Sequence, residues 1–300
     1  MNSHPLRRIE DIGRSKRMRK GMYVLPSLFT AVNIAAGYYA IVQSLAAVGD
    51  GQSWHFDFAA RAIGFAVLFD GLDGRIARMT RTTSEFGKQL DSLADAITFG
   101  VAPALLAYEW GFRFADAPFG NALWHSKLTQ LGAIVTFLFL TAGASRLARF
   151  NIQNDPKPSN PGRPGRKYFV GMPIPAGAGV LAAVVHLAAG DPIETWWMAA
   201  IWLALIFAVG YLMVCTWRFY SFKDLDMGRQ HPFAAFLLVA GITAGIWVFS
   251  GPVLFLIAMT YMLSGVLMRL AYYIRRPSAQ ADATPTAQQQ NLQQQTHESR

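Results

Sequence analysis

Charged residues are scarce in this chain, and cysteine is nearly absent. Asp, Glu, Lys and Arg make up 15% of the 300 residues, against about a quarter in an ordinary soluble domain. The single cysteine, Cys215, excludes an intrachain disulfide and a metal site built from cysteines, so we expect it to pack against apolar neighbours. The sequence has no HExxH motif and no Walker loop, and its six histidines form no ligand pattern. Zinc-dependent hydrolysis and ATP coupling therefore have no support.

Long apolar runs are abundant instead. Hydrophobic residues make up 53% of the sequence, and they form runs of about twenty residues, the length that crosses a bilayer as a helix. The runs are continuous and do not alternate with polar residues, which disfavours a β-barrel. We therefore expect an all-α fold, a polytopic transmembrane helical bundle with about eight spans. The expected spans are 23–45, 57–79, 85–108, 128–148, 170–189, 195–215, 232–249 and 252–273.

The positive charges indicate which side of the membrane faces the cytoplasm. All but three of the 27 Lys and Arg residues fall on one side of the expected spans, the exceptions being Arg61, Arg113 and Lys127. The positive-inside rule then places both termini in the cytoplasm. The net charge of +9 is read as orientation signal and lipid headgroup contact, not as a nucleic-acid surface.

Composition divides the chain into three parts. The expected parts are a basic cytoplasmic arm (1–22), a membrane domain (23–273) and a polar, Gln-rich tail without stable structure (274–300).

Four aspartates stand out within the apolar sequence. Asp70 and Asp73 lie three residues apart near the end of the second expected span, and Asp91 and Asp95 lie four apart near the start of the third. Each pair therefore shares one face of its helix. At a rise of about 1.5 Å per residue, Asp73 and Asp91 both lie about 10 Å from the helix ends at the intervening turn. Two antiparallel helices thus present four carboxylates at matched depth.

Four close carboxylates stay ionised only when positive charge lies among them. Hard divalent cations take oxygen ligands, and a pair of such ions activates an attacking oxygen and stabilises a leaving one. The small residues Gly71, Gly74, Ala77 and Gly87 keep the helix faces thin enough for a nucleotide to approach, and Arg78 supplies charge for phosphate. Helix caps or solvated acids are an alternative interpretation, and a divalent-cation or proton transporter is another.

The fixed residues of this stretch also match a known pattern. They read Asp70-x2-Asp73-Gly74-x2-Ala77-Arg78-x8-Gly87-x3-Asp91-x3-Asp95. In identity and spacing they resemble the signature of the CDP-alcohol phosphatidyltransferase family. Five further stretches resemble one branch, the bacterial CDP-diacylglycerol–serine O-phosphatidyltransferases. They are "LPSLFTAVNIAAG" (25–37), "DSLADAITFGVAPA" (91–104), "SRLARFN" (145–151), "FVGMPIPAGAG" (169–179) and "WRFYSFK" (217–223).

The resemblance implies a reaction and a set of site residues. It implies that a polar cavity, open to the cytoplasm of a bacterial inner membrane, binds CDP-diacylglycerol and two divalent cations, Mg²⁺ or Mn²⁺. The acceptor hydroxyl attacks the phosphorus that bears diacylglycerol, and CMP leaves; with L-serine the product is phosphatidylserine. The four aspartates would hold the cations, and Asp95 would also act as the base. The CDP site would be lined by Gly74, Ala77, Arg78 and Gly87, while Asn33 in the first span either binds substrate there or bridges helices.

The acceptor alcohol is the least constrained part of this reading. Serine brings a carboxylate, so its pocket needs a cation. The candidate cations at cytoplasmic helix ends are Arg146, Arg149, Arg218 and Lys223, and Arg149 gains weight because Asn151 follows it. Ser221 is a further candidate for contact with the acceptor. Each cation equally fits a positive-inside helix end. Choline, glycerol phosphate and inositol phosphate stay as alternative acceptors, and the last two need the extra cations of segment 146–167.

Expected partners are membrane lipids and not nucleic acid. The apolar helices beyond residue 195 offer a surface for a homodimer.

Overall fold

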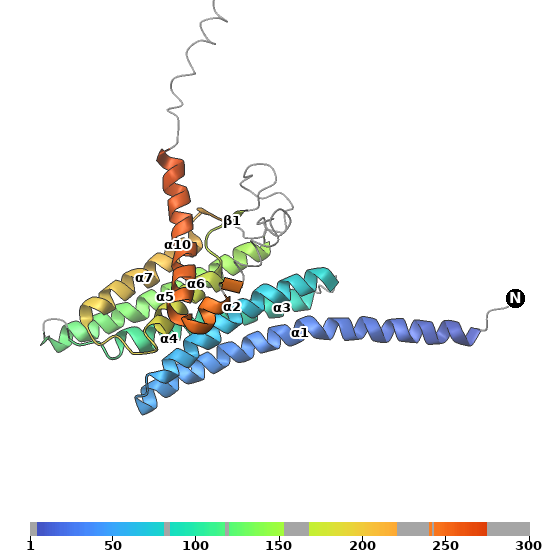
Figure 1. Ribbon diagram of the computed structural model, residues 1–300, viewed down its shortest axis with the longest axis horizontal. Helices are drawn as coiled ribbons and strands as arrows, with labels where there is room; N and C mark the ends of the chain where they lie inside the picture. Colours follow the sequence, from blue (N-terminus) through green and yellow to red (C-terminus); the bar gives the residue numbers. More distant parts are fainter. Residues whose placement is uncertain are drawn as a thin grey trace, which may run out of the picture.

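The computed structural model describes residues 5–80, 85–117, 120–152, 168–220, 240–241 and 243–274. Within these ranges it is a helical bundle with one two-stranded ribbon (Figure 1). Its helices are α1 (Pro5–Asp50), α2 (Trp54–Thr80), α3 (Glu85–Asp95), the π-helix η1 (Ala96–Val101), α4 (Ala102–Phe112), α5 (Ala122–Ile152), α6 (Ile174–Leu187), α7 (Trp196–Val214) and α10 (Ser250–Ile274). The strands are β1 (Tyr168–Val170) and β2 (Arg218–Tyr220).

Five segments of the described chain are long and apolar enough to cross a membrane. They are Leu28–Asp50, Gln89–Phe112, Ala122–Ile152, Trp196–Val214 and Ser250–Leu270. The predicted helical membrane protein is therefore confirmed, whereas the count of eight spans and the cytoplasmic position of the termini stay predictions. Of the span predicted at 232–249, residues 232–239 and 242 lie outside the described residues, and 240–241 and 243–248 are helical.

The structure describes the predicted N-terminal arm but little of the predicted tail. Helix α1 begins at Pro5, so the basic arm is one continuous helix with the first span, and its N-terminal half extends past the other helices (Figure 1). Residues 275–300, which include nearly all of the predicted tail, lie outside the described part of the chain.

A short two-stranded ribbon, which the sequence did not predict, accompanies the helices of the predicted all-α bundle. Strands β1 and β2 pair antiparallel, with Phe169 opposite Phe219. The helix predicted from residue 170 begins only at Ile174. Pro173 holds an extended conformation with ψ of 142° as the N-cap of α6, and a proline disfavours helix for the residue before it. The backbone N–H groups of Gly171 and Met172 instead donate to carbonyls at Trp217 and Leu212, each at 2.8 Å.

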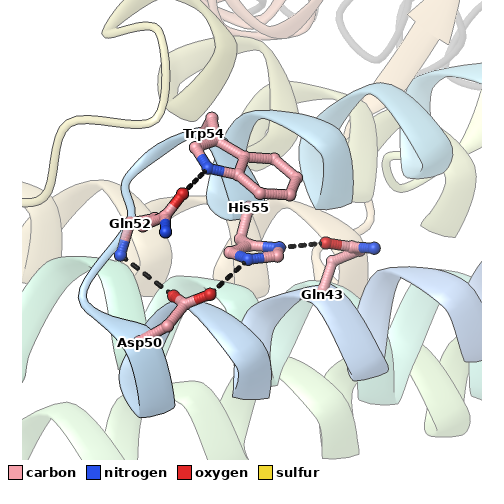
Figure 2. A network of polar contacts seen from close by, with 5 residues as sticks. All are labelled: Gln43, Asp50, Gln52, Trp54 and His55. Carbon is pink, nitrogen blue, oxygen red and sulfur yellow. Dashed lines mark hydrogen bonds and ion pairs between the residues drawn. The ribbon is translucent and has the colours of Figure 1, made fainter.

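A polar network fixes the turn between α1 and α2, at the end of these helices opposite the aspartates (Figure 2). The His55 ring contacts Asp50 through Nε2 at 2.7 Å and Gln43 through Nδ1. The backbone N–H of Gln52 donates to Asp50 at 3.0 Å, and the Trp54 indole N–H donates to Gln52. This turn sets the register between α1 and α2, and therefore which residues of α1 face the aspartates further along.

A second polar cluster joins three helices at the same end. Asp57 of α2 contacts His186 of α6 at 2.5 Å and pairs with Arg61 at 2.7 Å. The other ring nitrogen of His186 lies 2.9 Å from the hydroxyl of Ser250, the first residue of α10. Because Asp57 and His186 are largely buried, this cluster attaches α6 and the start of α10 to α2.

Candidate active site

Three carboxylates from two helices converge in the structure. Asp70 of α2 and Asp91 and Asp95 of α3 each offer an oxygen, and these oxygens all lie within 4.8 Å of one another. All three residues are half-buried, and Asp70 and Asp91 are close enough for direct electrostatic repulsion. Such a group of hard oxygen donors, held together against its own repulsion, is what a divalent cation binds.

The other residues predicted for the metal and the nucleotide are placed only by their backbone or by their helix. Asp73 lies one turn beyond Asp70 on the same face of α2, and its side chain falls outside the described part. The side chains of Ala77 and Arg78 fall outside it as well, and Gly74 is placed only by its helical backbone. Gly87 is half-buried on α3, one turn before Asp91. Gly71 is exposed, and a Cβ at this position would meet nothing within 4 Å.

A π-helix begins directly after Asp95. In η1 the backbone N–H of Ala102 donates to the carbonyl of Ile97, five residues back. Pro103 has no N–H to donate to Phe99, four residues back, and this missing bond favours the wider turn just before it. π-helical turns occur often at functional sites. The sequence carries this signal in Pro103, although hydropathy alone reads residues 85–108 as one regular helix.

Helix α1 approaches η1 closely and brings Asn33 to Asp95. A Cβ at Gly37 would lie 2.5 Å from the Thr98 hydroxyl oxygen, so only glycine permits this approach. The Thr98 hydroxyl donates to the Asn33 carbonyl at 2.9 Å. The Asn33 side-chain N–H donates to Asp95 Oδ1 in a long bond of 3.5 Å. Among the described residues, Asn33 Oδ1 has no hydrogen-bond partner, although it is buried. An unsatisfied buried acceptor is costly, so a ligand donor is expected there.

Arg146 of α5 supplies positive charge beside the carboxylates. Its guanidinium is largely buried and interacts electrostatically with Asp95 and with Tyr261 of α10. The Nε–H of Arg146 is buried and has no hydrogen-bond partner in the part of the chain that is described. The end of α5 is tied to α3 by Asn151, which donates to the Ser92 hydroxyl at 2.8 Å. Sequence reasoning missed Tyr261, because its spacing relates it to no other polar residue.

The remaining acceptor candidates differ from Arg146. Arg149 donates to the backbone carbonyls of Met213 and Val214, each at 3.5 Å, at the C-terminal end of α7. This is the position of a helix C-cap, and it accounts for Arg149 structurally. The Arg218 backbone belongs to β2, and its side chain is outside the described residues, as are Ser221 and Lys223 entirely.

Known proteins resemble this chain in sequence. The profile of the family "CDP-alcohol phosphatidyltransferase" matches residues 23–209, a range that contains the carboxylates, Asn33 and Arg146 and ends before α10. The CDP-diacylglycerol–serine O-phosphatidyltransferase of Helicobacter pylori is 36% identical over 211 residues, 68% of this chain and 75% of the relative. That of Mycobacterium leprae is 34% identical over 212 residues, 68% of this chain and 60% of the relative. That of Saccharomyces cerevisiae is 36% identical over 161 residues, 53% of this chain and 51% of the relative.

Proposed function

Because this chain belongs to the CDP-alcohol phosphatidyltransferase family, we propose that it transfers the phosphatidyl group of CDP-diacylglycerol to the hydroxyl of L-serine. The products are phosphatidylserine and CMP. Phosphatidyl transfer is the reaction of the family, and the serine acceptor is supported by the names of relatives at 34–36% identity. The structural observation that carries the proposal is the convergence of Asp70, Asp91 and Asp95, with Asn33 and Arg146 beside Asp95.

The donor set fits divalent cations. Three half-buried carboxylates repel one another unless cations lie among them, and carboxylate oxygens are the ligands that Mg²⁺ and Mn²⁺ prefer. We assign two such cations to Asp70, Asp91 and Asp95, with Asp73 as the fourth ligand because it shares the face of Asp70. When bound, the cations neutralise the pyrophosphate of the donor and stabilise the charge that develops on its leaving oxygen.

The protein's own groups position the acceptor and move its proton. Asp95 accepts the proton of the serine hydroxyl, and Asn33 holds Asp95 in place through its donated hydrogen bond. The serine oxygen then forms a bond to the phosphorus that bears diacylglycerol. The bond from that phosphorus to the CMP oxygen breaks, and the electron pair leaves with CMP. Gly74, Ala77, Arg78 and Gly87 are assigned to binding of the CDP moiety.

The site is assigned to the cytoplasmic face of a bacterial inner membrane. The basic residues flank the end of the bundle that holds the aspartates, whereas Arg61, Arg113 and Lys127 mark the other end. This orientation gives the site direct access to soluble serine and releases CMP into the cytoplasm, while the acyl chains of the donor stay in the bilayer.

The proposal is tested with purified protein, CDP-diacylglycerol, Mg²⁺ or Mn²⁺, and a labelled alcohol. Serine, choline, glycerol phosphate and inositol phosphate are compared, and CMP release and lipid labelling are measured. We expect both to depend on serine and on the cation, and to be lost in Asp70→Asn. Asp116→Asn is the matched control, because Asp116 is exposed in the loop between α4 and α5.

Each outcome separates one alternative. CMP release with another alcohol but not with serine keeps the reaction and rejects the acceptor. Absence of CMP release with every alcohol rejects the enzyme, and uptake of labelled Mn²⁺ into proteoliposomes would then favour the transporter.

A further inference from the structure

Helix α10, which lies outside the family match, brings a tyrosine to the acceptor side of the site. Tyr261 is half-buried and interacts electrostatically with the Arg146 guanidinium. Its ring centroid lies 5.9 Å from that of Phe219 in β2, which is fully buried. One turn further along α10, a Cβ at Gly265 would lie 2.3 Å from the Phe219 ring. The glycine thus lets the α10 backbone press against Phe219, and this contact fixes where Tyr261 lies.

The other end of α10 is fixed as well. Ser250 contacts His186 at 2.9 Å, and a Cβ at Gly251 would lie 3.3 Å from the Leu187 Cα. Tyr261 follows Ser250 by eleven residues on one helix, a distance of about 16 Å along its axis. Because both ends of this stretch are attached to the bundle, the packing of α10 determines the position of Tyr261 along the helix axis.

We propose that Tyr261 and Arg146 together bind the carboxylate of an α-amino-acid acceptor, while Asn33 Oδ1 accepts from its ammonium group. This inference rests on the proposed function and adds the recognition of the acceptor. Arg146 offers a buried Nε–H without a hydrogen-bond partner among the described residues, and Tyr261 offers a neutral hydroxyl donor beside it. A carboxylate accepts from both. Asn33 offers a buried acceptor without a partner in that same part of the chain.

The placement of the three groups relative to Asp95 matches serine: Asn33 and Arg146 interact with Asp95, and Tyr261 interacts with Arg146. Asn33 is hydrogen-bonded to Asp95, and Arg146 interacts with Asp95 electrostatically. The group that would bind the serine carboxylate and the group that would bind its ammonium therefore both adjoin the proposed base. Serine carries its carboxylate and ammonium on one carbon and its hydroxyl on the next. With the first two groups held by Arg146 with Tyr261 and by Asn33, the hydroxyl is directed at Asp95. Choline has no carboxylate and would leave the Arg146 Nε–H unsatisfied.

Tyrosine suits this position better than a second cation. Arg149 already repels Arg146 electrostatically, and its own N–H groups donate to the carbonyls that end α7. A further positive charge would add to that repulsion, whereas the Tyr261 hydroxyl adds a donor without charge.

The test is Tyr261→Phe, which removes only the hydroxyl. We expect the KM for serine to rise about 10- to 100-fold, the effect of one hydrogen bond to a charged group, with the KM for CDP-diacylglycerol and kcat changed less than about twofold. Tyr211→Phe is the matched control, because Tyr211 is a tyrosine of α7 with 55% of its surface exposed. Its kinetics should equal those of the wild type.

Serinol, in which an alcohol replaces the carboxylate of serine, separates carboxylate binding from helix placement. We expect the wild type to prefer serine over serinol, and Tyr261→Phe to lose most of that preference without losing activity on serinol. In thermal unfolding with CDP and Mg²⁺, serine should stabilise the wild type more than Tyr261→Phe. If Tyr261→Phe loses as much activity with serinol as with serine, or if its KM for serine is unchanged, the role of Tyr261 is rejected and the proposed function is not affected. A wild type without serine-dependent CMP release overturns the proposed function itself.

Discussion

Replacing Asp95 with asparagine separates its role in the reaction from its role in the fold. The substitution keeps the size of the side chain. It also keeps an oxygen that can accept the hydrogen bond from Asn33, which is 3.5 Å long in the wild type. It removes the proposed base and one charge of the proposed cation ligands. Loss of a general base alone lowers turnover by about 10²- to 10⁴-fold, or about 3 to 5 kcal/mol of transition-state stabilisation. We therefore expect CMP release at least about 100-fold below wild type.

Stability of the metal-free protein should move in the opposite direction. Two unit charges at the 4.8 Å that bounds this cluster repel by about 1 kcal/mol in water and about 3 kcal/mol at a dielectric constant of about 20. The three aspartates are half-buried and still reached by solvent, which screens their charges, so the lower figure applies. Asp95→Asn relieves two such repulsions and loses one attraction to Arg146. The net expectation is a metal-free variant about 1 kcal/mol more stable than the wild type.

Thermal unfolding of the detergent-solubilised protein, with chelator and then with Mg²⁺, measures this. The wild type should gain more stability from Mg²⁺ than Asp95→Asn, because the variant has lost a ligand charge. The exposed Asp116→Asn controls for the chemical change itself. Near-normal CMP release by Asp95→Asn would show that another group takes the serine proton. A metal-free variant clearly less stable than the wild type would refute the repulsion between these carboxylates.

Three further predictions concern the scaffold. Gly37→Ala places a Cβ 2.5 Å from a hydroxyl of η1 and should cost about 1–3 kcal/mol in unfolding free energy together with turnover, whereas Gly49→Ala, with nothing within 4 Å, should cost neither. Asp57→Asn weakens the buried contact to His186 and should lower stability by about 1–3 kcal/mol, measured by thermal unfolding, with CMP release per folded molecule unchanged. Burial raises the pKa of the Cys215 thiol, so less thiolate is present at neutral pH, and alkylation by iodoacetamide, followed by mass spectrometry, should be slower in the folded than in the unfolded protein and should speed up as pH rises.

The carboxylate cluster was accessible from sequence because local geometry determines most of it. Spacings of three and four residues place each pair on one helix face, and a short turn returns the chain at one level. The depths therefore match whatever surrounds the two helices. Asp70, Asp91 and Asp95 lie together as this reasoning requires. The predicted ligand Asp73 belongs to the same face by its backbone, and its role stays a prediction.

The ribbon and the π-helix were not predicted because hydropathy does not register the loss of a backbone N–H. The sequence from Tyr168 is as apolar as that of a membrane-spanning helix. Because of Pro173, however, α6 begins only at Ile174, and the three residues 168–170 pair with β2 instead. Pro103 has a comparable effect on the end of η1. In both cases the sequence signal is a proline within or next to an apolar segment.

Acceptor recognition was the hardest part to predict, because the residues proposed for it come from helices far apart in the chain. Asn33, Arg146 and Tyr261 lie on α1, α5 and α10, and no spacing rule relates them. Sequence reasoning favoured Arg149 for its neighbour Asn151. The geometry favours Arg146, because Arg149 donates to the carbonyls that end α7. Only the packing distinguishes a cation that caps a helix from one with an unsatisfied donor beside a base.

This difference in origin separates the chemistry of the site from its selectivity. The residues proposed to bind the cations and CDP-diacylglycerol all lie within 70–95, where any change in spacing would rotate a carboxylate off its helix face. The residues proposed for the acceptor come from three distant helices. Of these, Arg146 and Tyr261 lie on helices other than α2 and α3, so they can change without altering the spacing of the carboxylates. A change at Tyr261, outside the family match, should therefore alter which alcohol is used while leaving the KM for CDP-diacylglycerol unchanged. A change at Asp70 or Asp91 should lower the rate with every alcohol alike.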